Sequence, residues 1–193
     1  MVAGKDVMEK KDFVIKLICE KDSSSQIRSE LTFLLAAIPE LKDLIGFEHR
    51  HPHHHLDVWE HTLLALSHSK NRPEIRMALL LHDIGKPHCY QQEGDIRHYR
   101  GHGEKSYLMA RGILKNLGFD ANFADHVCEI IKKHDIPLSE NDIRISPILS
   151  SDIFEVQRCD ALAHNPTHNK KRMAYIEKTA QLIGKYVADG ECL

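Results

Sequence analysis

The sequence predicts an all-α fold, a single-domain helical bundle of 193 residues. Apolar residues recur at helical spacing along nearly the whole chain, as they do in helices that pack on a common core. No stretch shows the alternation of β-branched residues that indicates a strand. Hydrophobic residues make up 42% and charged residues 28% of the chain, an ordinary composition for a globular domain with a real core. Because neither a repeat nor a linker divides the sequence, residues 1–193 are expected to form one domain.

The helices predicted in the first half of the chain cover about residues 10–20, 23–38, 57–70 and 74–84. Ser23 and Gln26 are expected to form a capping box at the start of the second helix, and Pro39 ends that helix. A short turn follows and closes at Gly46, a typical residue just after a helix. Pro73 stands where a first-turn proline belongs, ahead of a strongly apolar helix that we expect to be buried.

The helices predicted in the second half cover about residues 104–117, 120–134, 151–164 and 169–187. Before them, residues 89–100 form an expected loop with a short hairpin around residues 93–95. Asp120 caps the second of these helices, and the polar residues 139–141 are expected to break the chain before the third. The last helix has an apolar face that could pack internally or against a second copy, so a homodimer is one expectation.

Charge and cysteine usage exclude several classes of protein. Twenty-six basic and 28 acidic residues give a formal charge of −2, which does not fit an extensive nucleic-acid surface but allows a local patch for one RNA end. No apolar run approaches the roughly 20 residues of a membrane-spanning helix. The start of the sequence lacks a signal-peptide core. Five scattered cysteines without a C-x-x-C pair suggest reduced thiols and a cytoplasmic location.

Histidine is unusually abundant, with 15 residues, and it is the commonest metal ligand in proteins. The pair His82–Asp83 in ALLLHDIGKP ends the buried helix. Two groups that are costly to bury there are satisfied together either by a divalent metal ion or by an ion pair at the helix end. Lys86 adds a cation beside them, where it could neutralise a phosphoryl oxygen.

Further candidates occur at matching places in other helices. His61 lies in DVWEHTLLAL, His102 stands between two glycines in RGHGEKS, and His134 ends a helix in EIIKKHD. Asp160 projects from an apolar helix face, where an unpaired carboxylate is costly. Taken singly, a lone helical histidine such as His61 is more often a capped or partly buried residue than a ligand. For His102 the alternative is a loop histidine, and for Asp160 it is a capping role. A bundle can instead direct such side chains toward one site, which gives six candidate ligands: His61, His82, Asp83, His102, His134 and Asp160.

These motifs together resemble a known family. The successive blocks are IRSELTFLLAAIPELKDLIG, HPHHHLDVWEHTLLAL, MALLLHDIGKP, RHYRGHGEKS, KKHD and RCDALAHNP. They resemble the HD-domain metal-dependent phosphohydrolases, and most of all the HD domain of bacterial tRNA nucleotidyltransferases (CCA-adding enzymes). The resemblance covers about residues 25–166, with the first and last helices expected to pack on this core.

The resemblance implies the ligands of a primary metal at four positions: His61, His82, Asp83 and Asp160. His102 and His134 match positions that hold a second metal in dinuclear members. Lys86 matches a lysine that faces the scissile phosphate, so the residues expected to act in catalysis are Asp83, Lys86, His102 and His134. Family members use Fe, Mn, Ni, Co or Zn, with Mg as a further option, as one or two ions.

Substrate contacts are expected from five residues: Lys86, Arg100, His54, His55 and Asp135. For His54 and His55 the alternative is a solvated loop, which is the expectation for the neighbouring His49 and His51. Likewise, the basic run at residues 170–172 is expected to be a solvated helix start. Arg100 is favoured for a bidentate phosphate contact.

The function implied by the resemblance is hydrolysis of phosphomonoesters or phosphodiesters by metal-activated water. The substrates implied are nucleotides or RNA ends of the 2′-nucleotide or 2′,3′-cyclic phosphate type. The sequence shows no nucleotidyltransferase head and no HDxxED motif, so neither CCA addition nor ppGpp hydrolysis is expected. Two alternatives remain: a dinuclear hydrolase of dinucleotide polyphosphates or other nucleotides, and a metal-holding regulatory module that binds nucleotide or RNA with little turnover.

Overall fold

Helices build nearly all of the regular secondary structure of the described chain, as the sequence predicts. The computed structural model describes residues 2–190, so Cys192 lies outside the described residues. The elements are α1 (Val2–Cys19), α2 (Ser23–Ser29), α3 (Leu31–Ala37), η1 (Pro39–Leu44), α4 (Val58–Ser67), α5 (Pro73–Leu81), η2 (Lys86–His88), β1 (Gln91–Glu93), β2 (Ile96–His98), α6 (His102–Asn116), α7 (Ala121–Lys133), α8 (Glu140–Ile145), α9 (Pro147–Ala163) and α10 (Lys170–Gly190).

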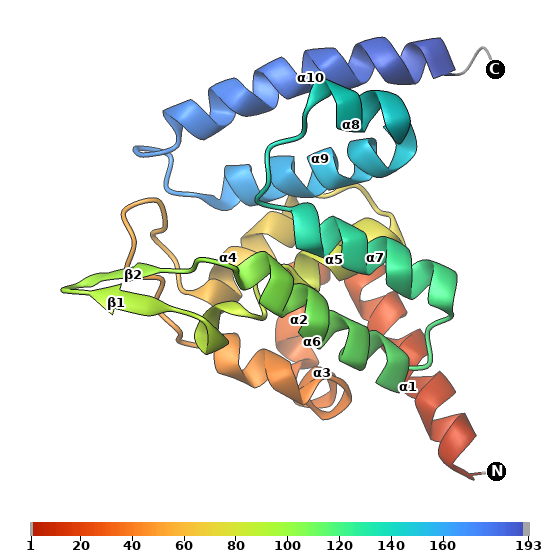
Figure 1. Ribbon diagram of the computed structural model, residues 1–193. Helices are drawn as coiled ribbons and strands as arrows, with labels where there is room; N and C mark the ends of the chain where they lie inside the picture. Colours follow the sequence, from red (N-terminus) through yellow and green to blue (C-terminus); the bar gives the residue numbers. More distant parts are fainter. Residues whose placement is uncertain (1, 191–193) are drawn as a thin grey trace.

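Helix α5 lies at the centre of the bundle, and α1, α4, α7 and α9 all contact it. Helix α6 packs on α7, while α10 lies across α8 and α9 at one edge of the molecule (Figure 1). Strands β1 and β2 form the predicted antiparallel hairpin, with Glu93 opposite Ile96 and Gly94 at φ +61° in the turn. In Figure 1 this hairpin projects from the bundle on the side away from the N-terminus.

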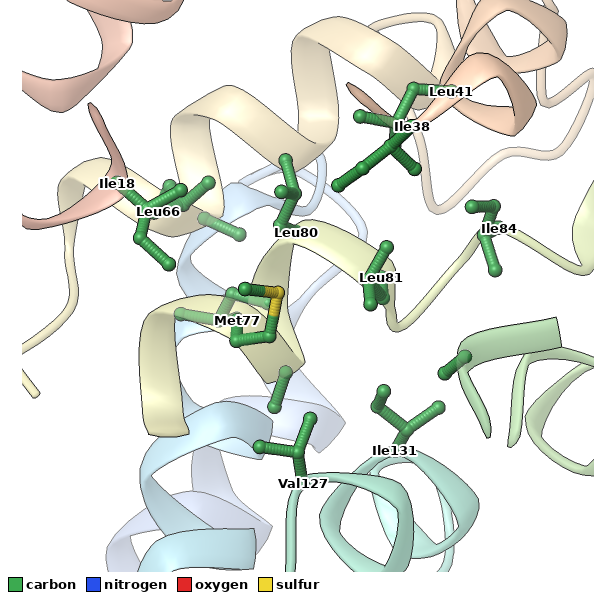
Figure 2. Close-up of a cluster of buried hydrophobic side chains, with 14 of the residues drawn as sticks. Ile18, Ile38, Leu41, Leu66, Met77, Leu80, Leu81, Ile84, Val127 and Ile131 are labelled. Carbon is green, nitrogen blue, oxygen red and sulfur yellow. The ribbon is translucent and has the colours of Figure 1, made fainter. Parts of the chain in front are cut away.

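Core packing surrounds α5 and holds it in place. All five residues of its last turns, 77–81, are fully buried, and a helix that is apolar all round must be covered on every side. Figure 2 shows Met77 between Leu66 of α4 and Val127 of α7, and Leu81 between Leu41 of η1 and Ile131 of α7. This packing sets the position of the carboxyl end of α5, where His82 and Asp83 follow.

A buried arginine joins the first helix to α5. Arg76 is only 6% exposed, and its Nη1 donates to the carbonyls of Ile18 and Glu20 at 2.7 and 2.8 Å. The last carbonyls of a helix have no partner within the helix, so the guanidinium satisfies the carboxyl end of α1.

The start of the second helix differs from the prediction. The cap is Asp22, whose side chain accepts from the Ser25 amide at 3.3 Å, and Ser23 is the first helical residue. Aspartate caps as well as serine does, and its charge also favours the amino end of a helix. The predicted helix is also divided at Glu30, between α2 and α3.

The segment after α7 also corrects the prediction. Residues 139–141 were expected to break the chain, but Ser139 and Asp142 form a capping box that starts α8. Helix α9 then begins at Pro147, earlier than predicted. The apolar residues there give no helical period, because Ile145 and Ile148 are 66% and 75% exposed and do not belong to a buried face.

The apolar face of the last helix is covered from within. Ile176 and Ile183 are 5% and 8% exposed, and α10 packs on α9. Among the described helices, none is long and apolar enough to cross a membrane. The homodimer stays a prediction.

Candidate metal centre

The six ligand candidates meet at one place, although they come from five helices or their ends. All six are buried, with exposures from 0% to 8%. They are His61 on α4, His82 and Asp83 just after α5, His102 at the start of α6, His134 just after α7, and Asp160 on α9.

One group of atoms surrounds the Oδ2 side of Asp83. The Nε2 atom of His61 lies 2.9 Å from Oδ1 of Asp160, and the Nε2 atom of His82 lies 3.3 Å from Oδ2 of Asp83. The Nε2 atom of His82 also lies 3.8 Å from Oδ1 of Asp160, and the Nε2 atom of His61 lies 3.9 Å from Oδ2 of Asp83. Ligands about 2.1 Å from one ion lie roughly 3.0 Å apart at a right angle and up to about 4.2 Å apart when they are opposite each other, so these separations fit a shared cation.

A second group faces the other oxygen of the same carboxylate. The Oδ1 atom of Asp83 lies 3.4 Å from Nε2 of His102 and 3.7 Å from Nε2 of His134. The two imidazole nitrogens are 3.0 Å apart. Asp83 therefore has one oxygen in each group, the arrangement of a carboxylate that bridges two ions.

Backbone carbonyls fix the tautomer of all four histidines. The Nδ1 atoms of His82, His102 and His134 lie 2.7, 2.8 and 2.6 Å from the carbonyl three residues earlier. His61 makes the equivalent contact with the Ala163 carbonyl at 3.3 Å. A carbonyl only accepts, so each Nδ1 carries the hydrogen. Each Nε2 of a neutral ring then presents a lone pair to the cluster, as metal ligation requires.

Several buried acceptor atoms of the cluster have no hydrogen-bond donor. His82 Nε2 and Asp83 Oδ1 have no hydrogen-bond partner, and such groups are costly to bury. His102 and His134 direct two lone pairs at each other. A divalent cation in each of the two groups would satisfy these atoms, so the residues present fit one or two metal ions with nitrogen and oxygen ligands.

Two glycines allow the elements to come this close. A Cβ at Gly85 would lie 2.7 Å from the Ser106 amide nitrogen and 2.9 Å from the His102 carbonyl oxygen. A Cβ at Gly103 would lie 3.1 Å from the Lys132 carbonyl oxygen. The missing side chains let α6 press against the ends of α5 and α7, which brings His102 to the cluster.

Burial and neighbouring charges shift the pKa values of the cluster. Burial alone would raise the pKa of Asp83, but in the metal-free protein the positive charges of protonated His82 and of Lys86 hold it well below the ordinary value. The pKa of Asp160 is depressed in the same way, with His164 and His61 opposing burial. Burial lowers the pKa of His102 to about 4. Charged carboxylates and a neutral imidazole are the states that bind metal.

Lys86 and His49 form a buried layer beside the cluster. The Lys86 ammonium, 5% exposed, lies 2.7 Å from Asp83 Oδ2 and 3.2 Å from His49 Nε2. His49 is 2% exposed, and its Nδ1 forms a hydrogen bond with the Leu56 carbonyl. Its ring stacks on the ring of His54, with the two centroids 3.6 Å apart. The expectation of a solvated loop is therefore wrong for His49, because the loop folds back over Asp83.

Two further side chains reach the cluster without having been predicted. His164 Nε2 lies 3.3 Å from Asp160 Oδ1, and Arg172 Nη2 lies 3.2 Å from Asp160 Oδ2. His164 could have been found, since it follows Asp160 by four residues and so shares its helix face. Arg172 was expected in a solvated helix start, but α10 turns it inward onto the carboxylate.

The expected substrate contacts are divided by the structure. Asp135 and His54 line a cavity of about 110 Å³ at the cluster, together with Lys86, His164 and Arg172. Arg100 is exposed and lines an adjoining hollow of about 340 Å³ that also contains Lys86 and His102. His55 is exposed and lines a separate hollow beside Gly46, so the structure does not bring it to the cluster.

Comparisons with known proteins match this region of the chain. The family model of the HD domain matches residues 53–179. A CC-adding tRNA nucleotidyltransferase of Thermus thermophilus is 35% identical over 104 residues, 50% of this chain and 24% of that protein. An A-adding tRNA nucleotidyltransferase of Deinococcus radiodurans is 31% identical over 119 residues, 58% of this chain and 27% of that protein. The chain thus spans about a quarter of the length of these curated relatives.

Proposed function

The chain belongs to the HD domain family, and from this premise we propose that it is a divalent-metal-dependent phosphohydrolase. Its substrates are phosphomonoesters or phosphodiesters of nucleotides or RNA ends, of the 2′-nucleotide or 2′,3′-cyclic phosphate type. The proposed ions are Fe, Mn, Ni, Co or Zn, with Mg as a further option, one or two per chain.

The observation that carries the proposal is the placement of the Asp83 carboxylate. Its Oδ2 faces His61 and His82, and its Oδ1 faces His102 and His134. Together with Asp160, these residues would hold the ions. When bound, the ions would activate water and offset the charge of the phosphoryl group.

The surrounding side chains supply the remaining chemistry. The Lys86 ammonium holds Asp83 in its charged form and places a positive charge at the wall of the cavity. Arg172 fixes the second oxygen of Asp160. Arg100, at the adjoining hollow, is suited to orient an incoming phosphate through two parallel hydrogen bonds.

The names of the relatives support an RNA-end substrate. They are tRNA nucleotidyltransferases, and the match lies in the part of each that aligns with this HD domain. Nucleotide addition is not proposed for this chain.

The test is phosphate release by protein stripped of metal and then supplied with Mn, Ni, Co, Fe, Zn or Mg. The substrates are a 2′-nucleotide, a 2′,3′-cyclic nucleotide and a dinucleotide polyphosphate. Asp83→Asn should abolish turnover, whereas Asp12→Asn, an exposed aspartate on α1, should not. Turnover of the polyphosphate alone would select the nucleotide hydrolase, and metal binding without turnover would select the regulatory module.

A further inference from the structure

A larger cavity opens beside the metal centre and has no role in the function proposed so far. Its volume is about 670 Å³, within the range of small-molecule binding sites. Its walls are the loop between α9 and α10, the first turn of α10, His53, and Pro137 before α8. In Figure 1 this region is the end of the bundle where the chain turns from α9 into α10.

The lining of this cavity is cationic. Lys170, Lys171 and Arg172 contribute three consecutive basic side chains, and no carboxylate is among the described residues that line it. These residues also form the first turn of α10, a helix of 21 residues. The amide groups at the start of a helix lack partners within it and carry partial positive charge. Both the basic side chains and the start of α10 therefore favour an anionic ligand in this cavity.

The larger cavity shares part of its lining with the cavity at the metal centre. His164 and Arg172 line both the 670 Å³ cavity and the 110 Å³ cavity at the cluster. Each of them contacts Asp160, at 3.3 and 3.2 Å. A molecule whose phosphate reached the cluster could thus extend past these two residues into the larger space.

Other features of the cavity suit a nucleoside as well as a phosphate. The ring of Tyr175 lines it and is held in place, since its hydroxyl accepts from the Leu138 amide at 2.9 Å and donates to Gln157 at 2.8 Å. A fixed aromatic ring provides a stacking surface for a base. Asn169, 6% exposed, has a buried Oδ1 without a partner, which is an acceptor for a hydroxyl or amino group of a ligand.

We propose that this cavity binds the nucleoside and the phosphodiester that precede the reacting phosphate, so that the preferred substrate is an RNA end of two or more nucleotides. The inference rests on the proposed function for the chemistry at the cluster. Lys170 and Lys171 contact the phosphodiester, and Tyr175 stacks on the base. The cationic lining is confined to this cavity, which agrees with the formal charge of −2 for the whole chain.

The experiment compares two substrates with the same reacting group, adenosine 2′,3′-cyclic phosphate and the dinucleotide ApA ending in a 2′,3′-cyclic phosphate. Charge-assisted contacts predict a KM about tenfold lower for the dinucleotide with the wild-type, metal-loaded protein. Lys170→Ala/Lys171→Ala should bring the ratio of the two KM values close to one, with the metal-to-protein ratio unchanged. Lys178→Ala, an exposed lysine of the same helix outside the cavity, should keep the wild-type ratio.

Equal KM values in the wild type, or the same ratio in the double variant, would overturn the inference. If neither substrate is turned over with any metal, the proposed function fails, and binding then decides. Anisotropy of a labelled ApA carrying a 3′-phosphate gives the dissociation constant of the metal-loaded protein. Roughly tenfold weaker binding by the double lysine variant supports the cavity as a binding site, and equal binding rejects it.

Discussion

The ion pair between Asp83 and Lys86 predicts a specific pattern of stability in the metal-free protein. Their charged atoms are 2.7 Å apart, and the residues are 1% and 5% exposed. Removing one partner of a buried pair leaves the other charge without compensation, at a cost of about 3–5 kcal/mol. Asp83→Asn should therefore lower the free energy of unfolding by that amount, although His49 keeps one contact with the ammonium.

The matched variant is Asp83→Asn/Lys86→Met, which removes both charges. It should recover about 2 kcal/mol relative to Asp83→Asn, within the range of couplings measured for contacting groups. For a chain of this size a change of 1 kcal/mol moves Tm by about 2–4 °C, so Asp83→Asn should melt roughly 6–20 °C below the wild type.

Thermal unfolding at pH 7 in excess chelator measures both effects. Asp83 is charged there in the folded protein, since its pKa is depressed, and its contribution disappears only as the pH falls through that lowered value. Adding metal should raise the Tm of the wild type and raise that of Asp83→Asn by less. If the double variant is as unstable as Asp83→Asn, or if Asp83→Asn melts like the wild type, the buried pair does not stabilise the fold.

Three further perturbations test other parts of the structure. Gly85→Ala places a Cβ 2.7 Å from the Ser106 backbone nitrogen, so it should cost about 1–3 kcal/mol in denaturant unfolding and weaken metal binding; Gly112→Ala, on the open side of α6, should do neither, and equal effects would refute the close-approach argument. Arg76→Met removes the donors at the end of α1 and should cost about 2–3 kcal/mol; unchanged amide exchange in α1 would contradict this. Burial and the charge of Lys86 lower the pKa of His49 to about 4. The neutral ring therefore stabilises the metal-free protein fully above about pH 6.5, the ordinary pKa of histidine. This contribution to the free energy of unfolding, about 3 kcal/mol, is lost as the pH falls toward 4. His49→Gln should flatten the stability curve between those pH values, and parallel curves would rule the mechanism out.

Much of the helical order, and the placing of some candidate ligands at helix ends, could be predicted from local signals. The apolar run before His82–Asp83 indicates a buried helix that ends at two polar residues, and the structure shows that helix at the centre of the bundle. Asp120 was predicted as a cap and accepts from the Phe123 amide. These features depend on residues within one or two turns of each other, so the sequence alone carries them.

Features that depend on packing between distant segments could not be predicted in the same way. His49 is buried because the loop after η1 returns over Asp83 and Lys86, a contact between segments far apart in the chain. Arg172 reaches Asp160 only because α10 packs on α9, while its neighbours Lys170 and Lys171 stay exposed. A run of three basic residues has the same sequence pattern in either case.

The charges at the 110 Å³ cavity link the binding of cations to the binding of anions. Three carboxylates line the cavity and two cationic side chains offset two of them, so with neutral histidines the protein alone presents one excess negative charge. Two divalent ions would convert this into an excess of three positive charges, at a depth where water screens little. A small anion that fits the cavity would then bind far better to loaded protein, and by reciprocity it would hold the ions more tightly. Inorganic phosphate in a dialysis buffer should therefore act as a retention factor for the metal, and the composition of the buffer becomes a determinant of how much metal the purified protein keeps.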